Sequence, residues 1–318
     1  MNLPAQFHGL DGVQLPPRPL HLALGMFDGV HLGHQAVIEP AVHSARRCGG
    51  LAGVLTFWPH PSTVFQPADH ARMLMSPETK ARVLFRLGAD AVIAQPFTPA
   101  FARTTAEDFL PLLRERLPQL AGVYVGENWR FGAGRRGDVR LLLAEAAKHR
   151  LTVVSVPGIY AQGEPISSSR IRDCLEAGRI EEANRFLGYF YFAQGTVVPG
   201  RCLGRTLGFP TLNVPWEPEL QPRLGVYAVR LTGDPAAAAA LPGVANYGRR
   251  PTVAAADAPL LEVHVLGACP WTAGARVTVE WLRFLRPEQK FGGVEELRAQ
   301  IARDCLAAAA FFQLPPPA

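Results

Sequence analysis

Two histidines lie three residues apart in residues 22–37, which read LALGMFDGVHLGHQAV. An apolar run ends near Met26 and a helical pattern begins at Gly33, so His31 and His34 stand where a strand is expected to give way to a helix. The free N–H groups and positive dipole end of a helix attract phosphate, and both imidazoles can donate hydrogen bonds to it. The pattern favours a phosphate-transfer site in which the histidines stabilise charge and do not act as bases.

A zinc pair and ordinary surface histidines are the alternative interpretations. No third ligand stands at zinc-site spacing from His31 and His34. Gly25 and Gly29 relax the turn, and Gly33 would let a ligand approach the start of the helix closely. The phosphate site is therefore the preferred interpretation.

A second candidate anion site lies in ISSSRIR, residues 166–172. Ser168 and Ser169 can cap a helix and donate hydrogen bonds to phosphate, and Arg172 adds a fixed cation. Simple capping remains open as the alternative, above all for Ser168. His60, between two prolines on a stiff loop, is expected to contact substrate or form part of a lid.

Polar and aromatic side chains also gather in GENWRFG, residues 126–132. Asn128 offers a donor and an acceptor suited to a nucleotide or ribose edge. Trp129 and Phe131 offer aromatic surface to a ligand, although core packing is an equally open interpretation. In the F-D-G segment, Asp28 is expected to orient the turn rather than touch substrate.

The elements that would position these residues alternate between apolar runs and helical patterns, which predicts a parallel sheet covered by helices. Two helix starts are signalled by Ser76 before Pro77 and by Thr105 with Asp108 three residues later. The expected strands are residues 20–26, 51–57, 90–95, 122–126 and 151–156, and the expected helices are residues 33–47, 76–87, 105–117, 138–150 and 168–187.

From residue 189 the pattern changes to strands separated by Gly/Pro turns, which favours a small antiparallel barrel. A final amphipathic segment places Val294, Leu297 and Ile301 on one helical face. The domain boundary therefore falls near Gly188. The expected strands are residues 189–198, 225–233, 260–266 and 275–285.

Composition narrows the class of protein. The 318 residues suffice for two domains, and 48% hydrophobic content can fill two cores. A net charge of +5 suits anionic ligands but is too diffuse to argue for nucleic acid. Five cysteines without a C-x-x-C pair indicate neither a disulfide framework nor a zinc knuckle. Neither an apolar run of spanning length nor a secretion signal is present, so a cytoplasmic location is expected.

The motifs and their order resemble those of prokaryotic bifunctional riboflavin kinase/FAD synthetases. GMFDGVHLGH looks like the nucleotide-binding signature of adenylyltransferases, and TFWPHP, GENWRFG and ISSSRIR follow it. GRTLGFPTLNV, GVANYGRRPTV, LEVHVL and FLRPEQKF then resemble the riboflavin kinase module. The resemblance implies an α/β fold: a doubly wound parallel-sheet FMN adenylyltransferase domain over residues 1–187, then a small antiparallel β-barrel riboflavin kinase domain with a terminal helix over residues 188–318.

The resemblance also implies the reactions: ATP phosphorylates riboflavin to FMN, and a second ATP then adenylylates FMN to FAD and pyrophosphate, with Mg²⁺ neutralising the polyphosphates. Nucleic acid and membrane are not expected partners, and the oligomeric state stays open. The residues implied are catalytic His31, His34 and Glu262; ATP- or phosphate-binding Gly25, Phe27, Gly29, Ser168, Ser169, Arg172, Gly204, Arg205 and Gly208; flavin-binding His60, Asn128 and Arg286; and metal-binding Thr211 and Asn213.

Glycines in the barrel half can be matched to the phosphate cradle that a kinase needs. Gly200, Gly204 and Gly208 would keep a loop backbone open to phosphates, with Arg201 and Arg205 adding positive charge. An ordinary flexible hairpin is the alternative.

The metal site and the base have candidates on strands. Thr211 and Asn213 fall on one side of an extended segment, as two oxygen ligands for Mg²⁺. Glu262 and His264 share one strand face. A strand glutamate is more often a solvated surface residue, and only the family likeness makes Glu262 the expected base for the ribityl hydroxyl.

The chain departs from the family pattern at three places. Asn128 stands where many relatives carry aspartate, Leu212 where alanine is usual, and CPWTAG, residues 269–274, replaces an aspartate-leucine-tyrosine-glycine turn. The last change is expected to affect flavin-loop closure or rate while leaving the metal and base candidates in place. Two rivals stay open: a nucleotidyltransferase for another phosphorylated acceptor, and a non-catalytic flavin or nucleic-acid binder.

Overall fold

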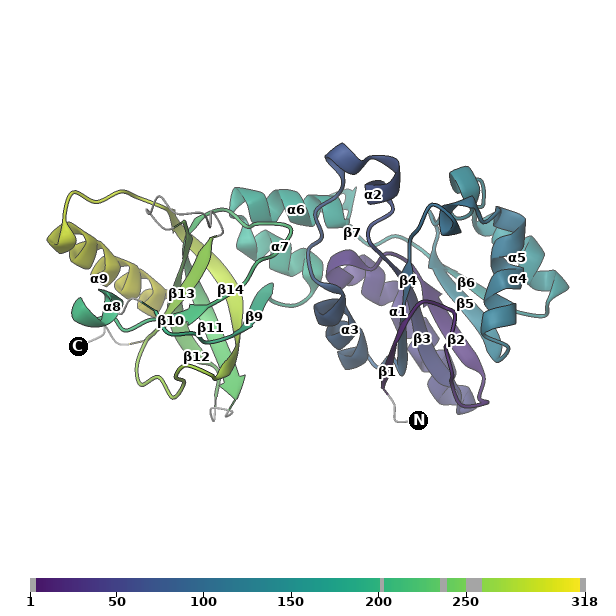
Figure 1. Ribbon diagram of the computed structural model, residues 1–318, viewed down its shortest axis with the longest axis horizontal. Helices are drawn as coiled ribbons and strands as arrows, with labels where there is room; N and C mark the ends of the chain where they lie inside the picture. The colour runs from purple at the N-terminus through teal and green to yellow at the C-terminus, as the bar shows by residue number, and fades with distance from the viewer. Residues whose placement is uncertain (1–3, 201–202, 235–238, 250–258, 315–318) are drawn as a thin grey trace. The chain divides into compact units, whose positions relative to one another are not determined.

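The chain forms two compact units, Met1–Ser168 and Ser169–Ala318 (Figure 1). The computed structural model describes residues 4–200, 203–234, 239–249 and 259–314. The first unit is an α/β unit with a single six-stranded parallel sheet, and the second contains a six-stranded antiparallel sheet. Both architectures match the predicted fold class.

The sheet of the first unit has the strand order β1-β4-β3-β2-β5-β6, and all its pairings are parallel. Five of the six strands coincide with the predicted apolar runs, because a strand covered on both faces must be apolar along its length. The edge strand β1 was not predicted. The strands are β1 Ala5–His8, β2 Leu20–Leu24, β3 Leu51–Trp58, β4 Ala91–Pro96, β5 Leu120–Gly126 and β6 Thr152–Val156.

The strand order places a topological switch point beside β2. Strands β3 and β4 extend the sheet on one side of β2, and β5 and β6 extend it on the other. Ligands of open α/β sheets bind outside the carboxyl ends of the strands at such a point. Helix α1, Leu32–Cys48, begins just beyond this end of β2 and carries the predicted phosphate motif.

Capping side chains fix the starts of α3 and α4 in the first unit. Ser76 accepts a hydrogen bond from the Thr79 N–H and Thr105 from the Asp108 N–H, as predicted. The helices are α1, α2 Ser62–Phe65, α3 Pro77–Arg86, α4 Ala106–Arg116 and α5 Val139–Lys148, and a small hairpin joins β7 Tyr160–Ala161 to β8 Glu164–Pro165. Within the described part of the chain, no helix has both the length and the apolar character that crossing a membrane requires.

The single helix predicted over residues 168–187 is two helices, α6 Ser168–Ala177 and α7 Ile180–Leu187. Gly178 between them has a φ of 77°, in the left-handed region that favours glycine and ends helices. The helical pattern on both sides of Gly178 is correct, but a continuous helix over this range is wrong.

The second unit is a nearly closed antiparallel barrel with strand order β10-β13-β12-β11-β14-β9. A bridge between Val198 and Asn213 brings the two ends of this order together. The barrel was predicted, but β12 was not. The strands are β9 Phe192–Thr196, β10 Leu212–Val214, β11 Gly225–Asp234, β12 Leu241–Gly248, β13 Leu260–Val265 and β14 Arg276–Pro287; the helices are α8 Leu203–Thr206 and α9 Val294–Phe311.

Aromatic rings fill the inside of the barrel. Tyr227, Tyr247 and Trp281 are fully buried, and the ring centroids of Tyr227 and Trp281 lie 4.5 Å apart. Helix α9 covers part of the outer face through Cys305 and Ala308. The first residue of the predicted apolar helix face, Val294, is 56% exposed, so the helix is attached through its second half.

Helix α7 is tied to the barrel by one buried side chain. The Asn184 amide donates to the Trp281 carbonyl at 2.8 Å, and its oxygen accepts from the Tyr191 N–H at 2.7 Å. Both α6, after its first residue, and α7 belong to the second compact unit. The domain boundary near Gly188 therefore stays a prediction that a pair of fragments can test.

We expect a fragment beginning at Gly188 to keep riboflavin kinase activity but to unfold more easily than one beginning at Ser169. Removing α7 leaves the Tyr191 N–H and the Trp281 carbonyl without their buried partner, which costs about 1–3 kcal/mol for each unsatisfied group. Urea unfolding and FMN formation by both fragments measure this difference. A folded Gly188 fragment that makes no FMN, while the Ser169 fragment does, would show that the boundary is misplaced.

Candidate active sites

The turn between β2 and α1 has a strained backbone. Phe27 and Val30 have φ values of 48° and 39°, and Gly29 has a φ of 77°. Positive φ is ordinary for glycine, uncommon for phenylalanine and an outlier for a β-branched valine. Such strain persists only where the surroundings fix the backbone, and it clusters at functional sites.

Side-chain hydrogen bonds from several segments hold this turn. The Asp28 carboxylate accepts from the Leu74 N–H at 2.9 Å, the Ser168 hydroxyl donates to the Asp28 carbonyl at 2.9 Å, and the Gln35 amide donates to the Val30 carbonyl at 2.9 Å. Asp28 therefore orients the turn, as predicted. Ser168 was predicted to be a phosphate ligand. In the structure its hydroxyl donates its proton to the Asp28 carbonyl of the turn.

His31 and His34 stack on each other just above the turn. Their ring centroids lie 3.6 Å apart with an interplanar angle of 19°, and the Phe27 ring meets His34 edge-on at 5.3 Å. A Cβ at Gly33 would lie 3.1 Å from the His31 ring, so Gly33 makes room for His31 itself. Likewise, a Cβ at Gly25 would lie 3.0 Å from the Phe27 ring. These two glycines permit the packing of the site.

Burial keeps both imidazoles neutral. It lowers the pKa of His31 from 6.5 to about 4, and it also lowers the pKa of His34, with the charges of His31 and Lys80 acting in the same direction. The Nδ1 atoms of both rings are buried and find no hydrogen-bond partner among the described residues. Neutral rings with unsatisfied nitrogens suit hydrogen bonding to a phosphate ligand better than proton storage.

Lys80 on α3 is a residue that sequence reasoning missed. It is 2% exposed, and its ammonium donates to the Met26 carbonyl at 2.9 Å and to the Thr56 hydroxyl at 3.1 Å. A signal was available, because Lys80 lies three and four residues before Val83 and Leu84 and so falls on the apolar face of its helix.

The GENWRFG segment divides between core and surface. Trp129 and Phe131 stack with centroids 4.6 Å apart and pack on Phe109. Core packing is confirmed for Phe131, whereas Trp129 packs against the core but is only half-buried. Asn128 is exposed in the turn that follows β5, at the carboxyl edge of the sheet. Its flavin contact stays a prediction.

The remaining candidates of the adenylyl site lie on two segments. His60 accepts from the Ser62 N–H at 3.1 Å through Nδ1, so a neutral His60 ring carries its proton on Nε2. Ser169 is exposed and Arg172 half-buried on α6, which belongs to the second unit from Ser169 onward. Their phosphate contacts stay predictions.

Strand register in the barrel brings together residues that are distant in sequence. Glu262 on β13 lies opposite Asn213 on β10 and opposite Asn246 on β12. Asn246 in turn lies opposite Val226, which lies opposite Arg286 on β14. Directly opposite residues of antiparallel strands share a face, so Asn213, Glu262, Asn246 and Arg286 form one polar row, which the apolar Val226 interrupts. Asn246 was missed because only the pairing of β12 reveals it.

The predicted metal ligands, Thr211 and Asn213, offer side-chain oxygen atoms, which are the ligands that Mg²⁺ prefers. Asn213 is 6% exposed, and its buried Oδ1 finds no hydrogen-bond partner among the described residues. A buried amide oxygen that accepts no hydrogen bond from these residues is a suitable ligand for a hard cation. The ring Nδ1 of His264 lies 2.8 Å from the Pro210 carbonyl and so anchors the segment that carries Thr211. No cluster of three His, Cys, Asp or Glu residues suited to a metal occurs in the described ranges.

The glycine loop before β10 is packed more tightly than predicted. A Cβ at Gly200 would collide with the Asn213 side chain, and a Cβ at Gly204 with the Phe209 carbonyl. Gly208, with a φ of 89°, faces open space. The glycines at 200 and 204 thus allow close packing of the loop on itself. Arg201 lies outside the described residues, as does the side chain of Arg205.

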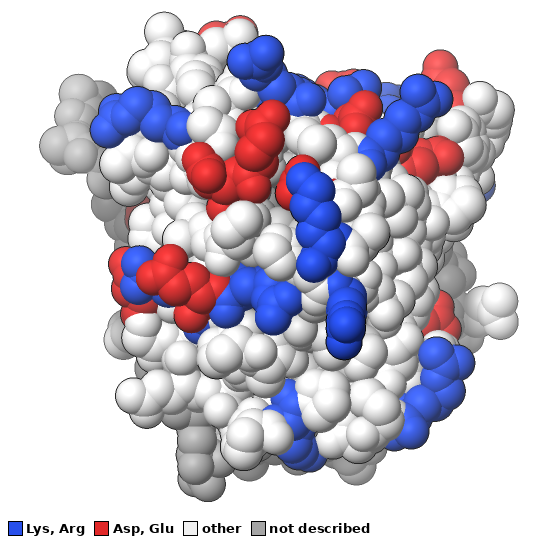
Figure 2. Space-filling view, turned by 90° about the vertical axis from the view of Figure 1, so that its right-hand side faces the viewer, with Lys and Arg blue, Asp and Glu red and all other residues white. Residues whose placement is uncertain are grey.

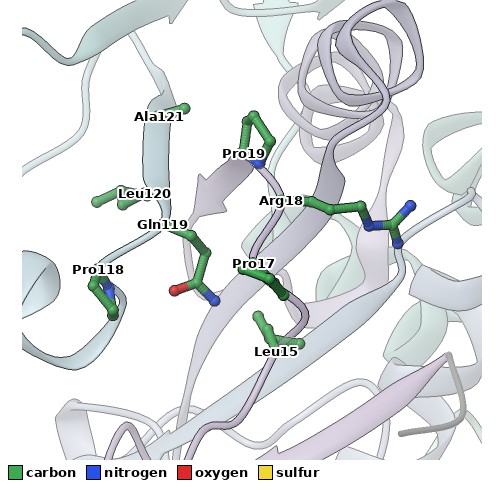
Figure 3. Close-up of a pocket in the computed structure, with 8 residues that line it drawn as sticks. All are labelled: Leu15, Pro17, Arg18, Pro19, Pro118, Gln119, Leu120 and Ala121. Carbon is green, nitrogen blue, oxygen red and sulfur yellow. The ribbon is translucent and has the colours of Figure 1, made fainter.

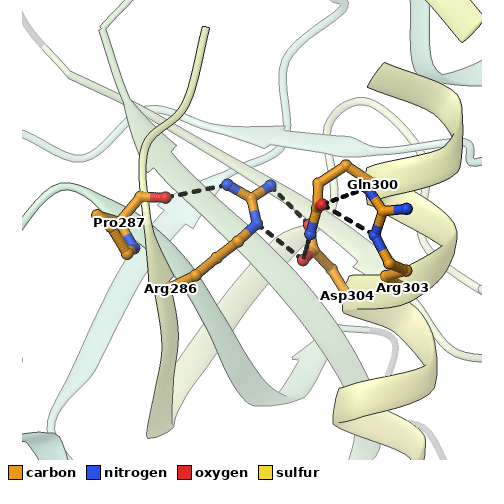
Figure 4. A network of polar contacts seen from close by, with 5 residues as sticks. All are labelled: Arg286, Pro287, Gln300, Arg303 and Asp304. Carbon is orange, nitrogen blue, oxygen red and sulfur yellow. Dashed lines mark hydrogen bonds and ion pairs between the residues drawn. The ribbon is translucent and has the colours of Figure 1, made fainter. Parts of the chain in front are cut away.

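Arg286, predicted to bind flavin, joins β14 to α9 (Figure 4). Its guanidinium donates to both carboxylate oxygens of Asp304, at 2.8 and 2.7 Å, and to the Pro287 carbonyl at 3.0 Å. The Gln300 amide also donates to Asp304. This network fixes α9 against the polar row, and a direct flavin contact of Arg286 stays a prediction.

The departure CPWTAG forms the connection from β13 to β14. Trp271 within it is 3% exposed, and a Cβ at Gly233 would lie 2.6 Å from its indole nitrogen. The segment is thus anchored on β11 by a buried ring.

Two pockets lie apart from these residues. One, of about 510 Å³, is at the amino ends of β2 and β5, the edge of the sheet opposite the histidines, and Figure 3 shows its wall of Leu15, prolines and Gln119. The other, of about 540 Å³, is lined by residues of α7, β14 and α9 together with Phe190. Neither contains a predicted site residue.

We expect acid to destabilise the first unit through His31. The unfolded chain binds a proton on this ring below pH 6.5 and the folded chain only below about pH 4, so stability falls as pH drops through this window. From pH 7 to 5.5 the loss assigned to His31 is about 1 kcal/mol.

Amide hydrogen exchange of β2 at the two pH values measures this loss, and His31→Asn is expected to remove it. An equal pH dependence in the wild type and the variant would contradict a buried, neutral His31.

Comparison with known proteins agrees with these features. Residues 14–170 match the FAD synthetase family and residues 187–312 the riboflavin kinase family. The chain is 37% identical over the full length of both chains to the bifunctional riboflavin kinase/FMN adenylyltransferase of Escherichia coli K12, and 38% identical to that of Listeria monocytogenes over 92% of each. It also superimposes, with a TM-score of 0.80 and 27% identity over 94% of this chain and 97% of the other, on a Streptococcus pneumoniae crystal structure titled as a macrolide-efflux protein. The chain belongs to the bifunctional riboflavin kinase/FMN adenylyltransferase family.

Proposed function

We propose specific residue roles for the two reactions of this enzyme of flavin cofactor synthesis, riboflavin kinase and FMN adenylyltransferase. The observation that carries the proposal is the pair of neutral, stacked histidines on a strained turn at the switch point of the sheet. FMN, FAD and riboflavin are the proposed ligands beside ATP, Mg²⁺ is the proposed metal, and the cytoplasm, where ATP is abundant, is the proposed location.

Adenylyl transfer is proposed to occur at the N-terminus of α1. A phosphate oxygen of FMN attacks the α-phosphorus of ATP, the bond to pyrophosphate breaks in line, and no covalent enzyme intermediate forms. Negative charge grows on the phosphate oxygens in the transition state. His31 and His34 donate hydrogen bonds to these oxygens from neutral rings, so neither histidine has to release a proton.

Phosphorylation is proposed to occur along the polar row of the barrel. The ribityl hydroxyl attacks the γ-phosphorus of ATP, ADP leaves, and the Glu262 carboxylate accepts the hydroxyl proton. Thr211 and Asn213 would hold Mg²⁺, which neutralises the phosphates when bound. Asn246, opposite Glu262, is in place to help position that carboxylate.

The rival function of nucleic-acid binding has little support on the face shown in Figure 2. There, Lys and Arg side chains are interspersed with Asp and Glu. A protein that tracks a phosphate backbone presents a continuous basic groove or stripe. The charges on this face are thus of mixed sign.

We expect the double substitution His31→Ala and His34→Ala to lower FAD formation by at least about 10²-fold and to leave FMN formation unchanged, because removing a single transition-state donor already costs about that much. The measurement is chromatography over time of purified protein with riboflavin, ATP and Mg²⁺. Wild type should show transient FMN followed by FAD.

His43→Ala is the matched control, because His43 lies on the same helix with an exposed ring. If a folded double variant loses both activities equally, the histidines have no local role in adenylyl transfer. Wild-type protein that forms neither product would contradict the function as a whole.

We expect Glu262→Gln to lower the kcat of FMN formation by about 10²- to 10⁴-fold, because glutamine keeps the shape but lacks the basic oxygen. Riboflavin affinity, followed by flavin fluorescence, and FAD formation from supplied FMN should not change. Glu295→Gln, on the exposed first turn of α9, is the control. A raised KM with a near-normal kcat would instead make Glu262 a flavin anchor.

A further inference from the structure

A buried ammonium group lies at the carboxyl edge of the parallel sheet. Lys80 Nζ donates to the Met26 carbonyl at 2.9 Å and to the Thr56 hydroxyl at 3.1 Å, and that hydroxyl donates its own proton to the same carbonyl at 2.7 Å. Met26 opens the strained turn, and Thr56 lies near the end of the neighbouring strand β3. One lysine from α3 thus joins the turn to β3.

Burying this lysine needs a reason beyond packing. A charged ammonium loses its hydration when it is buried, and lysine is almost never fully buried unless it is paired. A leucine or methionine would fill the same volume without this cost. The retained charge therefore indicates a use at this place in the sheet.

The position of the charge suggests that use. The Met26 carbonyl directly precedes Phe27, the first left-handed residue of the turn, so fixing this carbonyl fixes the entry to the turn that carries His31. Lys80 also acts electrostatically on His34, where its positive charge opposes protonation of the ring. The same charge favours an anion beside the histidines.

We propose that Lys80 is a positioning residue for adenylyl transfer: its ammonium fixes the Met26 carbonyl, and with it the turn that holds His31 and His34, and supplies a buried positive charge at this turn. This inference depends on the adenylyl-transfer function proposed above. It adds a residue from α3, outside the signature motifs, to the machinery of that reaction.

Three variants of Lys80 separate the charge from the hydrogen bond. Lys80→Met removes both, Lys80→Gln keeps an N–H donor but no charge, and Lys80→Arg keeps the charge. Lys148→Met is the matched control, because Lys148 is exposed on α5. The measurements are kcat and KM for ATP in FAD formation from supplied FMN, FMN formation by the same preparation, and the unfolding midpoint.

Lys80→Met is expected to lower the kcat of FAD formation by about 10²-fold, of the size seen when an electrostatic group is removed from a site. Lys80→Gln should lose about tenfold or more, Lys80→Arg should recover most of the loss, and FMN formation and Lys148→Met should stay within twofold of wild type. A purely structural role would lower kcat only in proportion to the unfolded fraction, without separating Gln from Arg.

Two results would overturn the proposal. One is a folded Lys80→Met with a wild-type kcat for FAD formation; the other is equal activity of the Gln and Arg variants, which decides the matter even if the Met variant does not fold. If Lys80→Met is normal while the double histidine variant is inactive, only the role of Lys80 fails. If wild type forms no FAD from FMN, the adenylyl-transfer function fails first.

Discussion

The first unit depends on one costly piece of backbone, the left-handed turn between β2 and α1. Phe27 and Val30 adopt positive φ values that their side chains disfavour, at a cost of order 1–3 kcal/mol each. Side chains from four segments hold the turn in place: Asp28 bonds to the backbone before α3, Ser168 reaches it from α6, Gln35 from α1 and Lys80 from α3.

The strained turn determines where the two imidazole rings lie. The turn sets two imidazoles against each other at the N-terminus of a helix, inside a region dry enough to keep both neutral. A neutral ring donates a hydrogen bond without bringing a formal charge that must be desolvated. The positive potential comes instead from fixed sources, the N-terminus of α1 and the ammonium of Lys80.

The barrel positions its polar groups by register instead of by a strained turn. Aromatic rings close its interior, so the polar residues lie on another face. There, pairing of β10, β13 and β12 aligns Asn213, Glu262 and Asn246 in one row. Helix α9 is fixed to the sheet by Arg286 and Asp304. The two units thus use different means to position their candidate site residues.

Strands and helix starts that depend on a local sequence pattern could be predicted. Apolar runs identified β2 to β6, and capping residues identified the starts of α3 and α4, because these signals lie within a few residues of each other. The short edge strand β1 and the strand β12 lack such a signal. Asp28 was correctly interpreted as a turn residue from its place in F-D-G.

What could not be predicted depends on tertiary packing. Gly33 was interpreted as leaving space for a ligand, but its missing side chain makes room for the His31 ring. Gly200 makes room for the Asn213 side chain in the same way. Only the folded backbone shows these contacts. Lys80 contributes from 46 residues beyond His34 in sequence, through contacts that no spacing rule predicts. The row through Asn246 depends on strand register in the same way.

The most direct test of this account is the titration of the ring nitrogens of His31 and His34 by nitrogen-15 NMR in the wild-type chain. Both rings are expected to be neutral at pH 7, and His31 is expected to gain its proton only near pH 4. Titration of His31 at or above its ordinary value of 6.5 would contradict this expectation, because the rings would then be open to water and would not form the buried, neutral pair on which the proposed adenylyl transfer depends.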